Sequence, residues 1–112
     1  MRQAARWYRL CVGSDISART FTVASMQSGQ MPSQAQTFDQ TRSGFEQLQR
    51  QLLRLEPDPT AILVVMEATG TDWMRLALAL VNAQIAVAVI NPAGYPLGAT
   101  RLRQSPAQAL QN

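Results

Sequence analysis

Alternating hydrophobic and polar residues in the first part of the chain are typical of strands with one buried face. The pattern predicts a strand at 9–17 (RLCVGSDIS) and a second strand at 19–27 (RTFTVASMQ), joined by a short link. A polar stretch at 28–36 predicts a turn, and residues 35–39 predict a brief third strand. Because the links are short, we expect these three strands to form an antiparallel meander.

The hydrophobic period then changes to that of a helix. The apolar positions that share one face are Phe45, Leu48, Leu52 and Leu55. This helix must end before the prolines at 57 and 59. At its start, Ser43 and Glu46 have the three-residue spacing of a capping box, and Thr41 is an alternative cap.

Two continuous apolar runs follow, AILVVM at 61–66 and IAVAVI at 85–90, and both predict strands that are buried on both faces. A second helical stripe lies between them, formed by Trp73, Leu76, Ala77, Leu80 and Val81. A strand–helix–strand unit of this kind predicts a right-handed parallel crossover. We therefore expect an α/β fold with one mixed sheet, an antiparallel three-strand meander followed by a parallel β-α-β unit. After Pro92 only a weakly specified last helix is expected.

Composition narrows the function classes. The chain has 112 residues, enough for one modest domain, and its 46% hydrophobic content excludes a disordered or collagen-like chain. Ten Lys+Arg, all of them arginine, against seven acids give a net charge of +3. This charge suits a partner with phosphates without establishing one, and a GC-rich genome would equally explain arginine without lysine. No segment approaches the ~20 apolar residues of a membrane span or carries a signal-peptide core, so we expect a cytoplasmic protein with no membrane partner.

The single cysteine and the absence of histidine restrict the chemistry further. They exclude a disulfide framework and a Cys/His zinc site within this chain, and we interpret Cys11 as a small buried hydrophobe. Without histidine, carboxylates must carry any chemistry.

Two carboxylates stand out by position. Asp15 lies inside or at the end of the first strand, and Glu67 directly follows the run AILVVM. In mixed sheets functional groups collect beyond the carboxyl ends of central strands, so Asp15 and Glu67 converge if the first and fourth strands are neighbours. A hard divalent cation such as Mg²⁺ would relieve their repulsion, and a pair of ions could serve phosphodiester chemistry. Alternatively, Asp15 is a turn residue that bonds its own backbone, and Glu67 is a solvated residue favoured by a nearby helix N-terminus.

Four motifs occur in a fixed order along the chain. They are VGSDIS at 12–17, T-x-x-G-F (Thr41, Gly44, Phe45), VVMEATG at 64–70 and VINP at 89–92. An aromatic residue, Trp73, and an L-A-x-A-L helix at 76–80 follow E-A-T-G. In these motifs the chain from Val12 to about Arg103 resembles the N-terminal domain of the RuvC-like DEDD insertion-sequence transposases, the group that includes the Piv and MooV invertases.

The resemblance implies a ribonuclease-H-like domain that binds Mg²⁺ through four acids in the order Asp, Glu, Asp, Asp. The first maps onto Asp15 and the second onto Glu67, which makes both residues catalytic and metal-binding candidates. Members of the family cut and rejoin DNA at insertion-sequence ends, with a separate C-terminal domain that carries a serine. The resemblance also implies DNA as partner and, in some members, an element-encoded guide RNA. A homo-oligomer is a further candidate partner, and the sequence does not determine the oligomeric state.

The chain departs from the family pattern after the N-P motif. The family's last two acids lie in K-T-D-x-x-D-A, where this chain reads RLRQSPAQALQN, and no acid follows Asp72. Asp72 is no substitute, because we expect it in the first turn of the second helix, favoured by the helix dipole. Ser14 also stands where the family has an aliphatic residue. We therefore expect Asp15 and Glu67 to hold a cation only weakly and without turnover, in the product of a truncated or frameshifted gene. Downstream DNA without a K-T-D-x-x-D-A motif in the other two frames would contradict that hypothesis.

These expectations divide the chain into a basic lead-in (1–8), an incomplete transposase domain (9–104) and a divergent tail (105–112). Arg101 and Arg103 are candidate nucleic-acid contacts, although arginines near a chain end are commonly only solvated. Trp73 is interpreted as core packing rather than as a platform for base stacking. Two other functions stay open. One is a non-catalytic nucleic-acid-binding remnant. The other is an actin-like ATPase fragment, which is ranked last because VGSDISART has too few glycines for a phosphate-gripping hairpin.

Overall fold

The computed structural model of the protein describes residues 8–91. Three sequence-based predictions lie outside these residues. They are the greater part of the basic lead-in, the last helix with the tail at 105–112, and the candidate nucleic-acid contacts Arg101 and Arg103.

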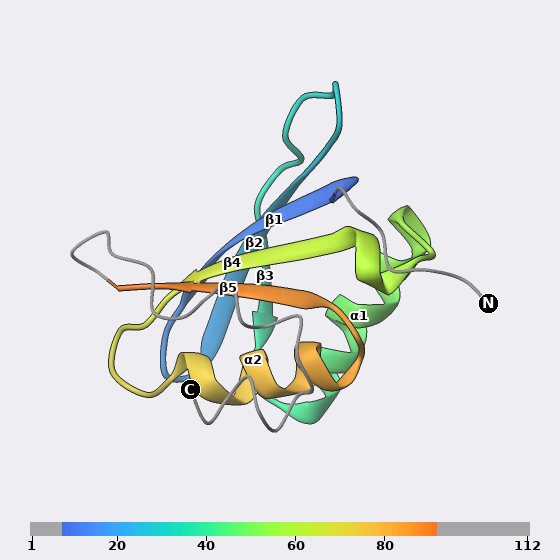
Figure 1. The fold of residues 1–112 in the computed structure, drawn as a ribbon. Helices are drawn as coiled ribbons and strands as arrows, with labels where there is room; N and C mark the ends of the chain where they lie inside the picture. Colours follow the sequence, from blue (N-terminus) through green and yellow to red (C-terminus); the bar gives the residue numbers. More distant parts are fainter. Residues whose placement is uncertain (1–7, 92–112) are drawn as a thin grey trace.

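Five strands form one mixed sheet in the order β3-β2-β1-β4-β5 (Figure 1). The strands are β1 (Leu10–Ile16), β2 (Thr20–Gln27), β3 (Gln36–Asp39), β4 (Ile62–Glu67) and β5 (Ala86–Ile90). Two helices, α1 (Arg42–Leu55) and α2 (Trp73–Asn82), and a short 3₁₀ turn, η1 (Pro59–Ala61), connect them. The β1–β2 and β2–β3 pairs are antiparallel, whereas β1–β4 and β4–β5 are parallel. The predicted fold class, a meander followed by a parallel β-α-β unit, is therefore confirmed.

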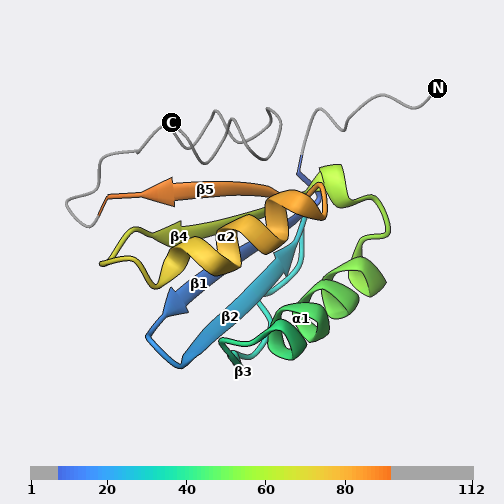
Figure 2. The same cartoon turned by 90° about the horizontal axis from the view of Figure 1, so that it is seen from below.

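Both helices cover the same face of the sheet (Figure 2). The crossover through α1 leads from β3 to β4, and the crossover through α2 leads from β4 to β5, so both advance across the sheet in one direction. Crossovers of the same hand that advance in the same direction place their helices on the same face. The prediction that 61–66 and 85–90 are buried on both faces is therefore wrong. Val64 and Met66 on the helix side are buried, but Leu63 and Val65 on the other side are half-buried.

Cys11 needs the same correction. It lies in β1 on the face that α1 and α2 leave open, and it is half-buried rather than buried. Because side chains alternate along a strand, an apolar run places every second residue on the open face.

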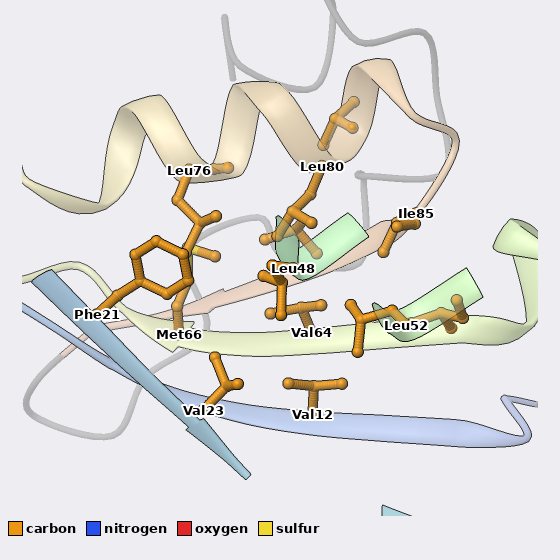
Figure 3. Close-up of a cluster of buried hydrophobic side chains, with 14 of the residues drawn as sticks. Val12, Phe21, Val23, Leu48, Leu52, Val64, Met66, Leu76, Leu80 and Ile85 are labelled. Carbon is orange, nitrogen blue, oxygen red and sulfur yellow. The ribbon is translucent and has the colours of Figure 1, made fainter. Parts of the chain in front are cut away.

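The core lies between the sheet and the two helices (Figure 3). Its labelled side chains are Val12, Phe21, Val23, Val64 and Met66 from the strands, Leu48 and Leu52 from α1, Leu76 and Leu80 from α2, and Ile85. Each is at most 5% exposed, and burial of such a side chain stabilises the fold by about 1.5–3 kcal/mol. Both predicted helical stripes are confirmed apart from Leu55, the last residue of α1, which is 41% exposed.

The T-x-x-G-F motif has a structural explanation at the start of α1. Thr41 is the N-cap, and its hydroxyl accepts a hydrogen bond of 3.0 Å from the Gly44 N–H, so the cap is Thr41 rather than Ser43. Gly44 lies against the backbone of Asp39, where an added Cβ would come within 2.9 Å of the carbonyl carbon and closer to its oxygen. Phe45 then packs against the ring of Phe21, with 5.8 Å between the centroids.

Candidate functional site

The two candidate carboxylates lie on neighbouring central strands. The parallel ladder of β1 and β4 ends where Gly13 pairs with Val65. Asp15 and Glu67 each stand two residues further along, so both side chains project from the face that the helices leave open. Both residues are exposed. The condition stated from the sequence, that the first and fourth strands are neighbours, is met, and Asp15 and Glu67 lie on the same face of the sheet, each two residues beyond the last β1–β4 pair.

Asp15 is not the turn residue of the β1–β2 hairpin. It lies inside β1 and pairs with Thr22 of β2. The turn is closed by Ser17, whose N–H donates to the Thr20 carbonyl at 2.8 Å and whose hydroxyl donates to the same oxygen at 3.0 Å. This overturns one alternative for Asp15. The alternative for Glu67 is compatible with the fold, because Glu67 is the exposed last residue of β4.

Neither carboxylate has a charged partner among residues 8–91. Within residues 8–91, the side chains of Asp15 and Glu67 make no hydrogen bond and no ion pair. In the same part of the chain, no group of three or more His, Cys, Asp or Glu side chains could hold a metal ion. The described residues therefore offer two carboxylate groups for a hard cation and no third acid beside them.

A row of side-chain oxygens continues from the carboxylates across the open face. Thr22 lies opposite Asp15, and Thr37 of β3 lies opposite Thr22. The hydroxyls of Thr22 and Thr37 share a hydrogen bond of 2.8 Å. Each hydroxyl has one donor and two acceptor positions, so this row can contact phosphate oxygens or water as well as its own neighbours.

Ser14 departs from the family pattern without leaving a polar group unsatisfied. Its hydroxyl donates to the Val65 carbonyl at 2.8 Å and so links β1 to β4 one residue before Asp15. A partly buried hydroxyl normally finds such a partner, and this one adds a bond beside the last backbone pair of the β1–β4 ladder.

The E-A-T-G segment fixes the chain directly after Glu67. The Ala68 N–H donates to the Ile90 carbonyl at 2.8 Å, which extends the β4–β5 pairing by one residue. Gly70 has a φ of +60°, a left-handed conformation that glycine adopts without steric cost. The indole N–H of Trp73 donates to the Gly70 carbonyl at 3.1 Å, and the ring packs against the core. The interpretation of Trp73 as core packing is confirmed.

Asp72 occupies a slightly different position from the predicted one. It is the N-cap residue of α2, not a member of the first turn, and its side chain makes no capping hydrogen bond. Its carbonyl oxygen accepts a hydrogen bond of 2.8 Å from the side-chain amide of Gln40. Asp72 therefore ends the connection between Glu67 and α2. It is not placed beside either carboxylate by any described contact.

Gln40 is the residue that sequence reasoning missed. It follows β3 directly and is 4% exposed. Its amide donates to the carbonyls of Ser17 and Asp72, which lie 23 and 32 residues away along the chain. The only signal in the sequence is a polar residue between a strand and a helix cap, and that signal does not distinguish a buried amide from a solvated one.

Charge is unevenly distributed along the chain. All seven acids but only six of the ten arginines lie in residues 8–91, so the described part has no positive excess. At the amino edge of β1, the Arg9 guanidinium donates two hydrogen bonds to Glu56, of 2.9 and 3.1 Å. The hydrogen bond from Arg9 holds the pKa of Glu56 below its usual value, and a second hydrogen bond from the Asp58 N–H adds to this effect. This ion pair ties the start of β1 to the segment after α1.

Among residues 8–91, neither helix is long and apolar enough to cross a lipid bilayer.

Comparison with known proteins gives one family. A family model described as a transposase, DEDD_Tnp_IS110, matches residues 12–105. The matched range begins in β1, extends beyond β5 and includes both Asp15 and Glu67. No curated protein matches the chain.

Proposed function

The chain belongs to the IS110-type DEDD transposase family, and we propose that it supplies the first two metal-binding carboxylates of an insertion-sequence transposase. A transposase acts on DNA, and a DEDD site uses a divalent metal. The observation that carries the proposal is the position of Asp15 and Glu67. They are exposed, without side-chain partners in residues 8–91, and on the same face at the carboxyl ends of two neighbouring central strands. A cation bound between two carboxylates offsets their mutual repulsion.

Asp15 and Glu67 are the residues that would hold the ion, and the donor set suits Mg²⁺, which prefers carboxylate oxygens and water. When bound, such an ion polarises a phosphodiester and stabilises charge on the attacking and leaving oxygens. Within residues 8–91 neither helix covers this sheet face, and the hydroxyls of Thr22 and Thr37 continue from the carboxylates as contacts for the phosphate oxygens of a DNA strand. In this proposal the chain's own residues bind the ion and orient the strand that is to be cut.

The chain by itself supplies only half of a DEDD set. No acid follows Asp72 in the sequence, and cation affinity rises with the number and charge of the ligands. We therefore propose weak metal binding and no DNA cleavage by this chain alone. The same observation favours a second candidate function, nucleic-acid binding without catalysis. A guide RNA remains a prediction from the family resemblance. Self-association and phosphate contacts by Arg101 and Arg103 remain hypotheses from the sequence.

Calorimetric titration of the chain with Mn²⁺ and Mg²⁺ tests the metal site. We expect roughly millimolar binding, as for sites with few protein ligands. Asp15→Asn and Glu67→Gln should each abolish it, because each removes one of two charged ligands while keeping the side-chain shape. Asp39→Asn is the matched control, since Asp39 is an exposed acid at the end of edge strand β3. Absence of binding, or binding that survives in both site variants, would contradict the proposal.

The metal titration separates the two candidate functions, and a DNA-cleavage assay tests the proposal that the chain alone does not cut DNA. Cation-dependent cleavage by the chain, lost in Asp15→Asn, would show that a two-carboxylate site is sufficient for catalysis. DNA binding without cleavage at any cation concentration agrees with both functions, and DNA binding without any Mn²⁺ or Mg²⁺ binding would support the non-catalytic function.

A further inference from the structure

Gln40 is the only buried polar residue in the described part of the chain. Both protons of its amide are used, one for the Ser17 carbonyl at 2.9 Å and one for the Asp72 carbonyl at 2.8 Å. Two carbonyl acceptors require the nitrogen side of the amide, so its orientation is determined by its partners. Its own backbone N–H donates to the Arg19 carbonyl at 2.8 Å, which anchors Gln40 to the β1–β2 hairpin.

The two carbonyls belong to the two segments that carry the candidate carboxylates. Ser17 follows β1 directly and is two residues beyond Asp15, and Asp72 closes the segment that begins at Glu67. The backbone ladder between β1 and β4 ends at Gly13 and Val65, before either carboxylate. Beyond the ladder, the Ser14 hydroxyl and the Gln40 amide connect these segments.

The side-chain oxygen of Gln40 indicates that this position is not chosen for packing alone. The Oε1 atom of Gln40 is buried and has no hydrogen-bond partner among residues 8–91. A buried oxygen without a partner is destabilising, and an apolar side chain of similar length would avoid that cost. The amide is therefore accounted for by the two bonds that it donates.

We propose that Gln40 is a positioning residue that holds the carboxyl ends of β1 and β4 at a fixed separation and thereby sets the divalent-cation affinity of Asp15 and Glu67. This inference rests on the proposed function for its metal-binding part. Removal of a residue that orients metal ligands through hydrogen bonds commonly lowers the metal affinity by about 10–100-fold. Because one amide of Gln40 hydrogen bonds to both segments, its removal should weaken the attachment of both segments at the same time.

The test compares Gln40→Met with Gln49→Met in the full chain. Gln49 is a matched control, since its partly buried amide also donates to a backbone carbonyl, that of Ala79 at 3.3 Å, but joins α1 to α2. Three quantities are measured, namely the Tm, the Mn²⁺ affinity by calorimetry, and the amide exchange of Ser17 and Met74 by NMR. Both of these amides are hydrogen bonded, to the carbonyls of Thr20 and Thr71.

We expect both variants to lower the Tm by several degrees, as for any lost internal hydrogen bond. Only Gln40→Met should weaken Mn²⁺ binding, by about tenfold or more, and only it should speed exchange at Ser17 and Met74 together. Equal Mn²⁺ affinity and equal exchange in the two variants would overturn the inference. If the unmodified chain binds no Mn²⁺, the proposed metal site is refuted. The amide exchange of Ser17 and Met74 then tests only whether Gln40 links the two segments. Faster exchange at both amides supports the link between the segments, and unchanged exchange at either one refutes it.

Discussion

Replacement of Gly44 by alanine tests the packing of α1 against the end of β3. The added Cβ would lie 2.9 Å from the Asp39 carbonyl carbon and 3.2 Å from its nitrogen, and the carbonyl oxygen is closer than either. These are backbone atoms, which cannot rotate away as a side chain can. Asp39 is also held in place, because it pairs with Thr20 and its carbonyl accepts a 2.8 Å hydrogen bond from the Thr41 N–H.

The start of α1 must therefore move away from β3 to accommodate the methyl group. Overpacking of this kind costs about 1–3 kcal/mol, and displacement of the Thr41 cap costs about 1 kcal/mol more. Alanine recovers roughly 1 kcal/mol through its higher helix propensity. The net loss of unfolding free energy is about 2 kcal/mol, which corresponds to a decrease in Tm on the order of 10 °C for a domain of this size.

Thermal and urea unfolding monitored by circular dichroism measures this loss. Gly13→Ala is the matched control, because a Cβ at Gly13 meets no atom within 4 Å and its φ is not positive. That variant should change stability by at most about 0.5 kcal/mol. If Gly44→Ala unfolds at the same temperature as the unmodified chain, or loses no more than Gly13→Ala, the close approach of α1 to β3 is refuted.

Three further outcomes are expected. Leu80→Ala should lower the unfolding free energy by about 2–5 kcal/mol because Leu80 is fully buried, whereas Leu78→Ala on the exposed side of the same helix should change it by at most about 0.5 kcal/mol; similar losses measured by urea unfolding would contradict the assignment of the buried face. Thr41→Ala should cost about 1 kcal/mol in the same assay and Ser43→Ala much less, since only Thr41 caps the helix; the reverse order would restore the capping box. The lowered pKa of Glu56 stabilises the fold at pH values above its unfolded-state pKa, and this contribution disappears as the pH falls through the lower folded-state pKa. Glu56→Gln should therefore flatten the acid side of a Tm–pH curve, and an unchanged curve would show that the ion pair contributes no pH-dependent stability.

The secondary structure could be predicted from the sequence because its signals are local. Alternation in β2, the apolar run of β4 and the 3.6-residue period of α2 each depend on residues a few positions apart. Pro57 and Pro59 marked the end of α1 for the same reason. The choice between Thr41 and Ser43 as the cap was not local in this sense. It depended on where the backbone first becomes helical, and α1 begins at Arg42, directly after Thr41.

The candidate site could be predicted in part. Asp15 and Glu67 stood out because each interrupts or ends an apolar strand, but their proximity was conditional on the order of the strands. The sequence could not show that both helices cover one face, because helical stripes do not specify the side of the sheet to which they are directed. The structure settles this point, and it explains why Cys11 is half-buried.

The sequence by itself determined the strands and helices, the parallel and antiparallel parts of the sheet, and the two carboxylates at the carboxyl ends of β1 and β4. The tertiary structure alone decided that Ser17, not Asp15, closes the hairpin, and that the amide of Gln40 joins the two segments that carry the carboxylates. The physical reason is distance along the chain. Hydrogen bonds across 23 and 32 residues leave no periodic pattern, and a buried glutamine and a solvated one are the same letter in the sequence.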